Sequence, residues 1–135
     1  MKDMKTLEYT DCFNDKTPVG FDIQQYLNNG NMYIGLMGEY EDGIEPYGDL
    51  TVNLGMKTPD YCGFVDVNNM GNAEKFIKEN ELGEFTGIAV KSGYVDYPLY
   101  QFSPEKLKEL CPDGIAMYEA NIGKARQPEP KNLAR

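Results

Sequence analysis

The 135-residue chain contains no histidine and no tryptophan, and it has only three cysteines. Without histidine it has no imidazole general base and none of the histidine-containing metal sites. The number of cysteines is odd and their spacing is wide, which argues against a disulfide framework; they are Cys12, Cys62 and Cys111. No run approaches the roughly 18 consecutive apolar residues of a membrane span, and the N-terminal residues lack the apolar core of a signal peptide. We therefore expect a reduced, cytoplasmic protein.

Basic residues are also scarce. The chain has 13 Lys and Arg against 22 Asp and Glu, and its net charge is -9. Residues 1–70 carry a net charge of -8, whereas residues 71–135 carry only -1. Because DNA and RNA bind through neutralised phosphates, this charge argues against direct nucleic-acid binding. A negative field instead speeds association with basic partners.

The first half of the sequence predicts β-strands. Apolar and polar residues alternate over 21–27, and a second apolar run covers 32–37. Between them lies Asn29-Gly30, the preferred pair for a two-residue type I′ turn in which both residues have positive φ. We predict a tight hairpin here, an earlier strand within 7–13, and a third strand over 50–54 with Thr51 on its polar face.

A helix and a second hairpin are expected next. Asn72 is predicted to cap a helix that runs through Glu81 and ends at a left-handed Gly83. Two further strands, over 85–91 and 94–102, are joined by Ser92-Gly93. Pro98 interrupts the second of these strands, which indicates an edge or a bend there.

The C-terminal part predicts two more helices. Ser103-Pro104-Glu105 supplies a hydroxyl cap, a first-turn proline and an acidic residue, and a further helix is expected from Pro112 to Gly123. Residues 124–135 are polar and are predicted to form a disordered tail. The order of elements predicts an α+β fold, with an antiparallel sheet and two or three helices on one face, as a single domain over residues 1–123.

The densest acidic segment lies within residues 39–49, where glycine and proline predict a loop. One interpretation is a solvated connector that keeps the protein soluble. Another is a recognition surface whose carboxylates occupy a basic groove meant for nucleic acid, while tyrosines fill apolar gaps. Binding of a divalent cation is the third possibility. The five acidic residues are Glu39, Glu41, Asp42, Glu45 and Asp49.

A second polar segment begins at Asp66. With Asn68 two residues later it starts like a calcium-binding loop, but Ile77 stands where the bidentate glutamate belongs. The polar side chains are therefore expected to hydrogen-bond the turn that leads into the helix. The alternative is a small-molecule or ion site formed by Asp66, Asn68 and Asn69 near Tyr97.

No catalytic constellation stands out. The cysteines lack a base, and both serines are explained by a turn and a helix cap. We therefore predict a non-enzymatic protein with no catalytic, cofactor-binding or metal-binding residues. Tyr94, Tyr97 and Tyr100 recur at a spacing of three, which indicates either packing around a bent strand or a partner-binding aromatic patch.

Three segments together resemble the bacterial domain of unknown function 4313 family. They are GFVDVNN at 63–69, AEKFIKENELG at 73–83 and YPLYQF at 97–102, and LTVNL at 50–54 resembles the strand that precedes them. Family members often have Pro-Trp just before the Ala-Glu of the helix, where this chain has Gly71 and Asn72. The resemblance implies a small cytoplasmic bacterial protein, often encoded on a mobile element, with no established activity.

From the sequence we expect a non-enzymatic module that binds a basic protein, and in one form a nucleic-acid mimic that inhibits a host factor. The alternatives are the small-molecule or ion site and a structural homo-oligomer whose tyrosine face pairs with itself. No membrane contact is expected, and the chain is predicted to be a monomer or a weak homo-oligomer. The expected binding residues are Glu39, Glu41, Asp42, Glu45, Asp49, Asp66, Asn68, Asn69 and Tyr97.

Overall fold

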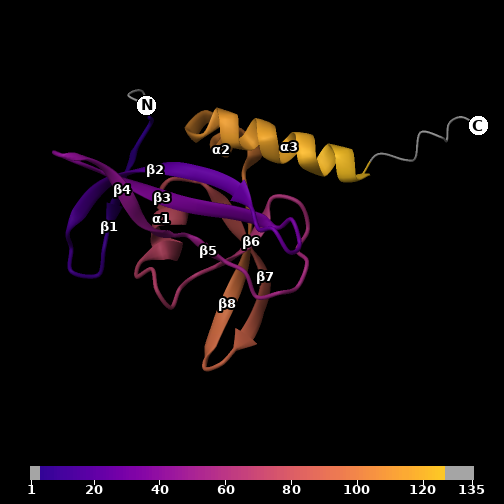
Figure 1. Cartoon of the computed structure of the whole chain (residues 1–135). Helices are drawn as coiled ribbons and strands as arrows, with labels where there is room; N and C mark the ends of the chain where they lie inside the picture. Colours follow the sequence, from indigo (N-terminus) through magenta and orange to yellow (C-terminus); the bar gives the residue numbers. More distant parts are fainter. Residues whose placement is uncertain (1–3, 127–135) are drawn as a thin grey trace, which may run out of the picture.

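Two four-stranded antiparallel sheets and three helices make up the fold (Figure 1). The computed structural model describes residues 4–126. The predicted α+β class is confirmed, but the strands divide between two sheets rather than forming one. No helix within the described residues is long and apolar enough to cross a membrane.

The first sheet is a meander in which each strand pairs with the next along the chain. Its order is β1-β2-β3-β4, and all pairs are antiparallel. Consequently the β1–β2 and β3–β4 turns lie at one end of the sheet, on the left in Figure 1, and the β2–β3 loop lies at the other. The strands are β1 (Leu7–Thr10), β2 (Lys16–Gln25), β3 (Met32–Tyr40) and β4 (Gly43–Asp49).

The predicted hairpin between β2 and β3 is present, but the prediction of a two-residue turn is wrong. The backbone N–H of Tyr26 donates to the carbonyl of Asn31, which leaves a four-residue loop. Gly30 has φ 75°, whereas Asn29 does not have positive φ. The Asn29 amide instead accepts from the Asn31 N–H and donates to Asn53, so it ties the loop to the chain beyond the first sheet.

The second sheet has the order β5-β6-β8-β7. The strand predicted over 50–54 is only two residues long, and Thr51 is buried rather than on a polar face. Its Oγ1 accepts from the backbone N–H of Ile34 at 3.1 Å, so this side chain bonds a strand of the first sheet. The strands are β5 (Thr51–Val52), β6 (Cys62–Val65), β7 (Gly83–Ser92) and β8 (Val95–Phe102).

The β7–β8 hairpin confirms the predicted pair of strands and projects from the body of the protein (Figure 1). Gly93 opens its turn with φ 66°. Strand β6 pairs with β8 over Leu99–Gln101 only, so Pro98 lies just beyond that pairing. On the other side, β7 bulges between Phe85 and Ala89. Pro98 therefore lies where β8 pairs with β7 alone, which agrees with the edge position that was one of the two predictions.

Three helices pack on these sheets: α1 (Ala73–Glu79), α2 (Pro104–Leu110) and α3 (Pro112–Arg126). The predicted Ser103 cap is confirmed, because its hydroxyl accepts from the Lys106 N–H at 3.2 Å. Asn72 does not cap α1: its φ is 68°, and its side chain bonds strand β1 instead. The left-handed residue after α1 is Glu81, with φ 55°, rather than Gly83.

The predicted end of the last helix at Gly123 is wrong, because α3 continues to Arg126. The remainder of the predicted tail, residues 127–135, lies outside the described residues. Helix α3 packs on β2, where a Cβ at Gly114 would lie 2.7 Å from the carbonyl oxygen of Ile23. A glycine therefore allows the closest approach of these two elements.

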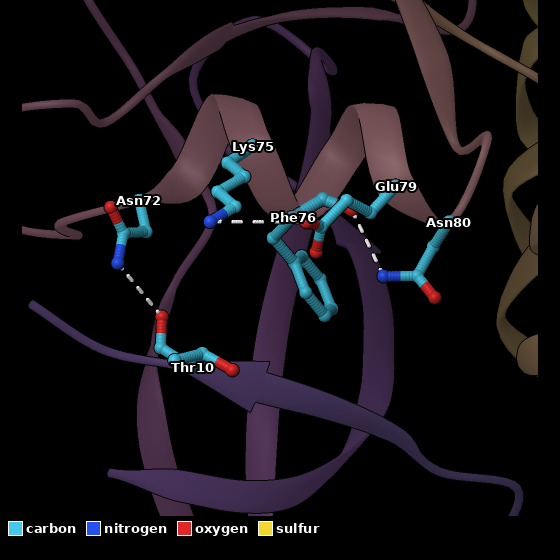
Figure 2. A network of polar contacts seen from close by, with 6 residues as sticks. All are labelled: Thr10, Asn72, Lys75, Phe76, Glu79 and Asn80. Atoms are coloured by element: carbon cyan, nitrogen blue, oxygen red, sulfur yellow. Dashed lines mark hydrogen bonds and ion pairs between the residues drawn. The ribbon is translucent and has the colours of Figure 1, made fainter. Parts of the chain in front are cut away.

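The core joins one face of the first sheet to all three helices and to strand β8. From α1, the ring of Phe76 points toward the strands (Figure 2) and lies 4.6 Å from the ring of Tyr9. Cys62, Phe64 and Leu99 form a second, smaller cluster. Fully buried members of the main core include Val19, Ile34, Leu36, Ile77, Leu82, Phe102, Leu107 and Ile115.

Candidate functional site

The acidic residues gather at one end of the first sheet, where the β1–β2 and β3–β4 turns lie. We call this surface the acidic end. Within the described part of the chain, none of its carboxylates takes part in an ion pair. The acidic end therefore presents a net negative charge, with six carboxylates beside Lys16 at the start of β2. It comprises Asp11 and Asp15 from the first turn, and Glu39, Glu41, Asp42 and Glu45 from the β3–β4 hairpin.

Apolar side chains are exposed among these carboxylates. Phe13 is 81 % exposed, Tyr40 42 % and Ile44 43 %. Aromatic side chains are enriched at protein–protein contacts, while charged groups commonly form the surrounding rim. The acidic end therefore combines both components of a protein-binding surface.

The segment over 39–49 is a β-hairpin rather than the predicted loop. Glu41 and Asp42 form its turn, and β4 is one of the two edge strands of the sheet. Between the Leu36–Gly48 and Met37–Pro46 pairs, Tyr47 is an extra residue that bulges from β4. Prolines, bulges and charged residues are the devices by which natural edge strands resist pairing with another chain. This edge is therefore suited to contacts through side chains.

The bulge directs Tyr47 toward the β1–β2 turn and the polar segment before α1. These elements line an open surface depression of about 200 Å³, which we call the Tyr47 hollow. The rings of Tyr9 and Tyr47 lie 5.4 Å apart in its wall. The cavity is smaller than a typical drug-sized pocket, so it suits a single side chain. Its lining includes Tyr9, Asp11, Phe13, Tyr47, Asn69 and Gly71.

Two hydrogen bonds between distant segments fix the base of this hollow. The Tyr9 hydroxyl donates to the carbonyl of Gly71 at 2.6 Å. The Asn72 amide donates to the carbonyl of Thr10 at 3.1 Å, as Figure 2 shows beside the Lys75–Glu79 ion pair of α1. A Cβ at Gly71 would lie 3.3 Å from that of Cys12, so the two turns approach closely here.

Asp11 organises the first turn and supplies charge to the hollow. Its Oδ1 accepts from the backbone N–H groups of Phe13 at 2.8 Å and Asp15 at 3.0 Å. Burial, followed by the negative charge of Asp11, raises the pKa of Tyr47 above its ordinary value. Burial also raises the pKa of Tyr9, with smaller contributions from Tyr47 and Asp11. Both phenols are therefore neutral donors at physiological pH.

The structure brings four of the predicted acidic residues together but places Asp49 at the other end of β4. There its carboxylate accepts from the Tyr33 hydroxyl at 2.7 Å. Asp66 is buried, and it accepts from the backbone N–H and the side-chain amide of Asn69, as the turn interpretation predicts. Asn68 is exposed, whereas Asn69 lines the Tyr47 hollow. Asn69 is thus the residue of this turn that adjoins the acidic end.

The tyrosines at spacing three do not form one face. Tyr100 is in the main core and donates to Glu74 at 2.5 Å, while Tyr97 packs with the smaller cluster. Tyr94 is fully exposed at the hairpin tip. Side chains three residues apart on a strand point to opposite faces, so Tyr97 and Tyr100 agree with the packing interpretation rather than with one aromatic patch. Tyr97 accordingly lies in the second sheet, apart from the main core that adjoins the acidic end.

Asp11 and Phe13 were not predicted because the expected strand extended through residue 13, and Asp15 follows directly in the same turn. Five residues, Asp-Cys-Phe-Asn-Asp, hold a turn signal, since Asp and Asn bond their own backbone and tolerate left-handed conformations. Asn14 does adopt φ 70°. Tyr47 was missed for another reason. The direction of its side chain depends on the bulge in β4, and that bulge is visible only in the strand pairing.

The fold and this end define a small acidic α+β protein built from two antiparallel sheets. The chain belongs to the family described as Domain of unknown function (DUF4313), which matches residues 20–122. Strand β1 and the β1–β2 turn precede the matched segment. No curated protein matches the chain with significant similarity, and no solved structure does so either.

Proposed function

We propose that this protein is a non-enzymatic module that binds a basic protein through its acidic end. One observation carries the proposal: six carboxylates without an ion pair in the described residues surround exposed Phe13, Tyr40 and Ile44. The field of such a surface steers a basic partner to it, and the apolar side chains supply contact area.

A finer form of the proposal is a nucleic-acid mimic. Carboxylates on a protruding hairpin replace phosphates in the basic groove of a host nucleic-acid-binding protein, and so inhibit it. The family resemblance supports a cytoplasmic bacterial protein encoded on a mobile element, where such inhibitors are useful. This form predicts that DNA or RNA competes directly with the protein for its partner.

The test is a triple substitution at the tip of the hairpin, Glu41→Gln, Asp42→Asn and Glu45→Gln. All three side chains are exposed, so we expect the fold to be retained. The immobilised protein captures partners from bacterial lysate, and these are eluted with a salt gradient and identified by mass spectrometry. We expect the triple variant to lose a basic protein that the wild type retains to high salt, because the attraction is electrostatic.

The matched control neutralises three exposed acids elsewhere: Glu81→Gln, Glu84→Gln and Glu105→Gln. Both variants change the net charge equally, so only a local effect separates them. Equal retention of the partner by both triple variants would exclude the acidic end as the binding surface. Competition with duplex DNA and with RNA then tests the mimic, which is excluded if neither displaces the partner.

A second candidate function is self-association through the β7–β8 hairpin. Strand β7 is an edge strand, and Phe85, Ile88 and Tyr94 are exposed along this hairpin. Exposed apolar groups gathered on one element mark contact sites. Sedimentation of the wild type and of an Ile88→Asp variant separates this function from the first, because a monomeric wild type at high concentration excludes it.

A further inference from the structure

We propose that the Tyr47 hollow receives the guanidinium group of one arginine from the basic partner. This inference rests on the proposed function, since it names the part of the partner that the acidic end recognises. The occupant is argued from charge and shape: the hollow is small, its wall is aromatic, and Asp11 is the charged residue in its lining.

The polar groups at the hollow are complementary to a donor without acceptors. Asp11 contributes a carboxylate whose Oδ1 holds the turn, which leaves Oδ2 without a hydrogen bond to the described residues. The Gly71 carbonyl accepts from Tyr9 and retains a second lone pair. Arginine has five N–H donors and no acceptor, so it satisfies carboxylate and carbonyl oxygens together.

The aromatic rings favour arginine over lysine. The half-buried ring of Tyr47 stands in the wall with the buried ring of Tyr9 behind it, and Phe13 is largely exposed at the cavity. A guanidinium is planar and weakly hydrated, and it stacks on aromatic rings, whereas an ammonium is compact and strongly hydrated. Partial burial of the hollow strengthens this preference, because a guanidinium gives up less hydration free energy than an ammonium when it leaves water.

The test uses three capped tripeptides, Gly-Arg-Gly, Gly-Lys-Gly and Gly-citrulline-Gly, titrated into ¹⁵N-labelled protein. We expect the arginine peptide to shift the amide signals of Asn69 and Gly71 and to bind more tightly than the lysine peptide. Citrulline has nearly the same shape but no charge, so its binding should be the weakest. Equal binding of the arginine and citrulline peptides, or shifts confined to residues outside the hollow, would overturn the proposal.

Two substitutions with a matched control test the groups involved. Asp11→Asn keeps Oδ1 as the acceptor of the turn and removes the charge, and we expect about threefold to tenfold weaker arginine binding. Tyr47→Leu removes the ring and should weaken binding about as much, while Tyr47→Phe keeps the ring and should bind like the wild type. Undiminished binding in both Asp11→Asn and Tyr47→Leu refutes the assignment.

Failure of this inference can be distinguished from failure of the proposed function with a hexa-arginine peptide. If the Glu41, Asp42 and Glu45 triple variant loses binding while Asp11→Asn and Tyr47→Leu do not, the acidic end binds cations and the hollow has no role. If hexa-arginine and hexa-lysine bind the wild type equally, the hollow does not select a guanidinium. If neither peptide binds, both proposals fail.

Discussion

Two glycines in helix α3 should respond in opposite directions to the same substitution. Replacing glycine by alanine inside a helix ordinarily stabilises it by about 1 kcal/mol. At Gly114, however, the new Cβ would lie 2.7 Å from the carbonyl oxygen of Ile23 and 2.8 Å from Sγ of Cys111. The carbonyl belongs to strand β2 and cannot rotate away, so the helix must move from the sheet. At Gly123 the new Cβ meets no atom within 4 Å among the described residues, apart from its chain neighbours and the adjacent backbone of the helix.

The magnitude follows from these opposing terms. Overpacking of this kind costs about 1–3 kcal/mol, which outweighs the gain in helix propensity. We expect Gly114→Ala to lower the free energy of unfolding by about 1–2 kcal/mol, and Gly123→Ala to raise it by about 0.5–1 kcal/mol. The thermal midpoint of Gly114→Ala should fall by roughly 3–6 °C.

The assay monitors urea unfolding of the wild type, Gly114→Ala and Gly123→Ala by circular dichroism. Their free energies of unfolding are compared directly if their m-values agree. A Cys111→Ala, Gly114→Ala double variant removes the contact with sulfur and should remain less stable than Cys111→Ala, because the backbone contact persists. If Gly114→Ala is as stable as Gly123→Ala, helix α3 is not held against β2 at the distance described, and the reasoning is refuted.

Three further predictions concern stability. Burial raises the pKa of Tyr9 and Tyr100, so the folded state binds protons more tightly than the unfolded one. Stability should therefore be unaffected by these groups below about pH 10 and should fall above it, as urea unfolding at pH 8 and 11 will show. Asn72→Ala should cost more than Asn72→Gly, because glycine accepts the observed φ of 68°, and a smaller loss for alanine in thermal melts would contradict this. Ser103→Ala removes the cap of α2 and should cost about 1 kcal/mol, whereas Ser103→Asp should not.

Much of the fold could be predicted because its signals are local. The Ser103 cap followed by Pro104 specifies the start of α2 by itself, and alternating residues specify β2. The division into two sheets could not be predicted, because it depends on which distant strands pair. Strand β6 pairs with β8 across 29 intervening residues, 66–94, and no local pattern encodes that choice.

Errors arose where a tertiary contact outweighed a local preference. Asn72 carries a capping side chain, yet that side chain reaches Thr10 in β1. Thr51 is polar but buried, since its hydroxyl replaces a missing backbone partner of Ile34. In the candidate site, composition alone identified the acidic segment over 39–49, although it predicted a loop where the structure has a hairpin. The Tyr47 hollow was not identified, because it joins three segments that the sequence separates.

The order in which the strands occur along the chain also bears on synthesis. The first sheet pairs only sequence neighbours, so its hairpins can form as the chain leaves the ribosome. Its inner face, however, is covered by residues as late as Phe102, Ile115 and Tyr118. The apolar face of the nascent first sheet therefore stays exposed to water until most of the chain has been synthesised. Aggregation or chaperone binding should concentrate in that interval, and the negative charge of the first half would then keep growing chains apart.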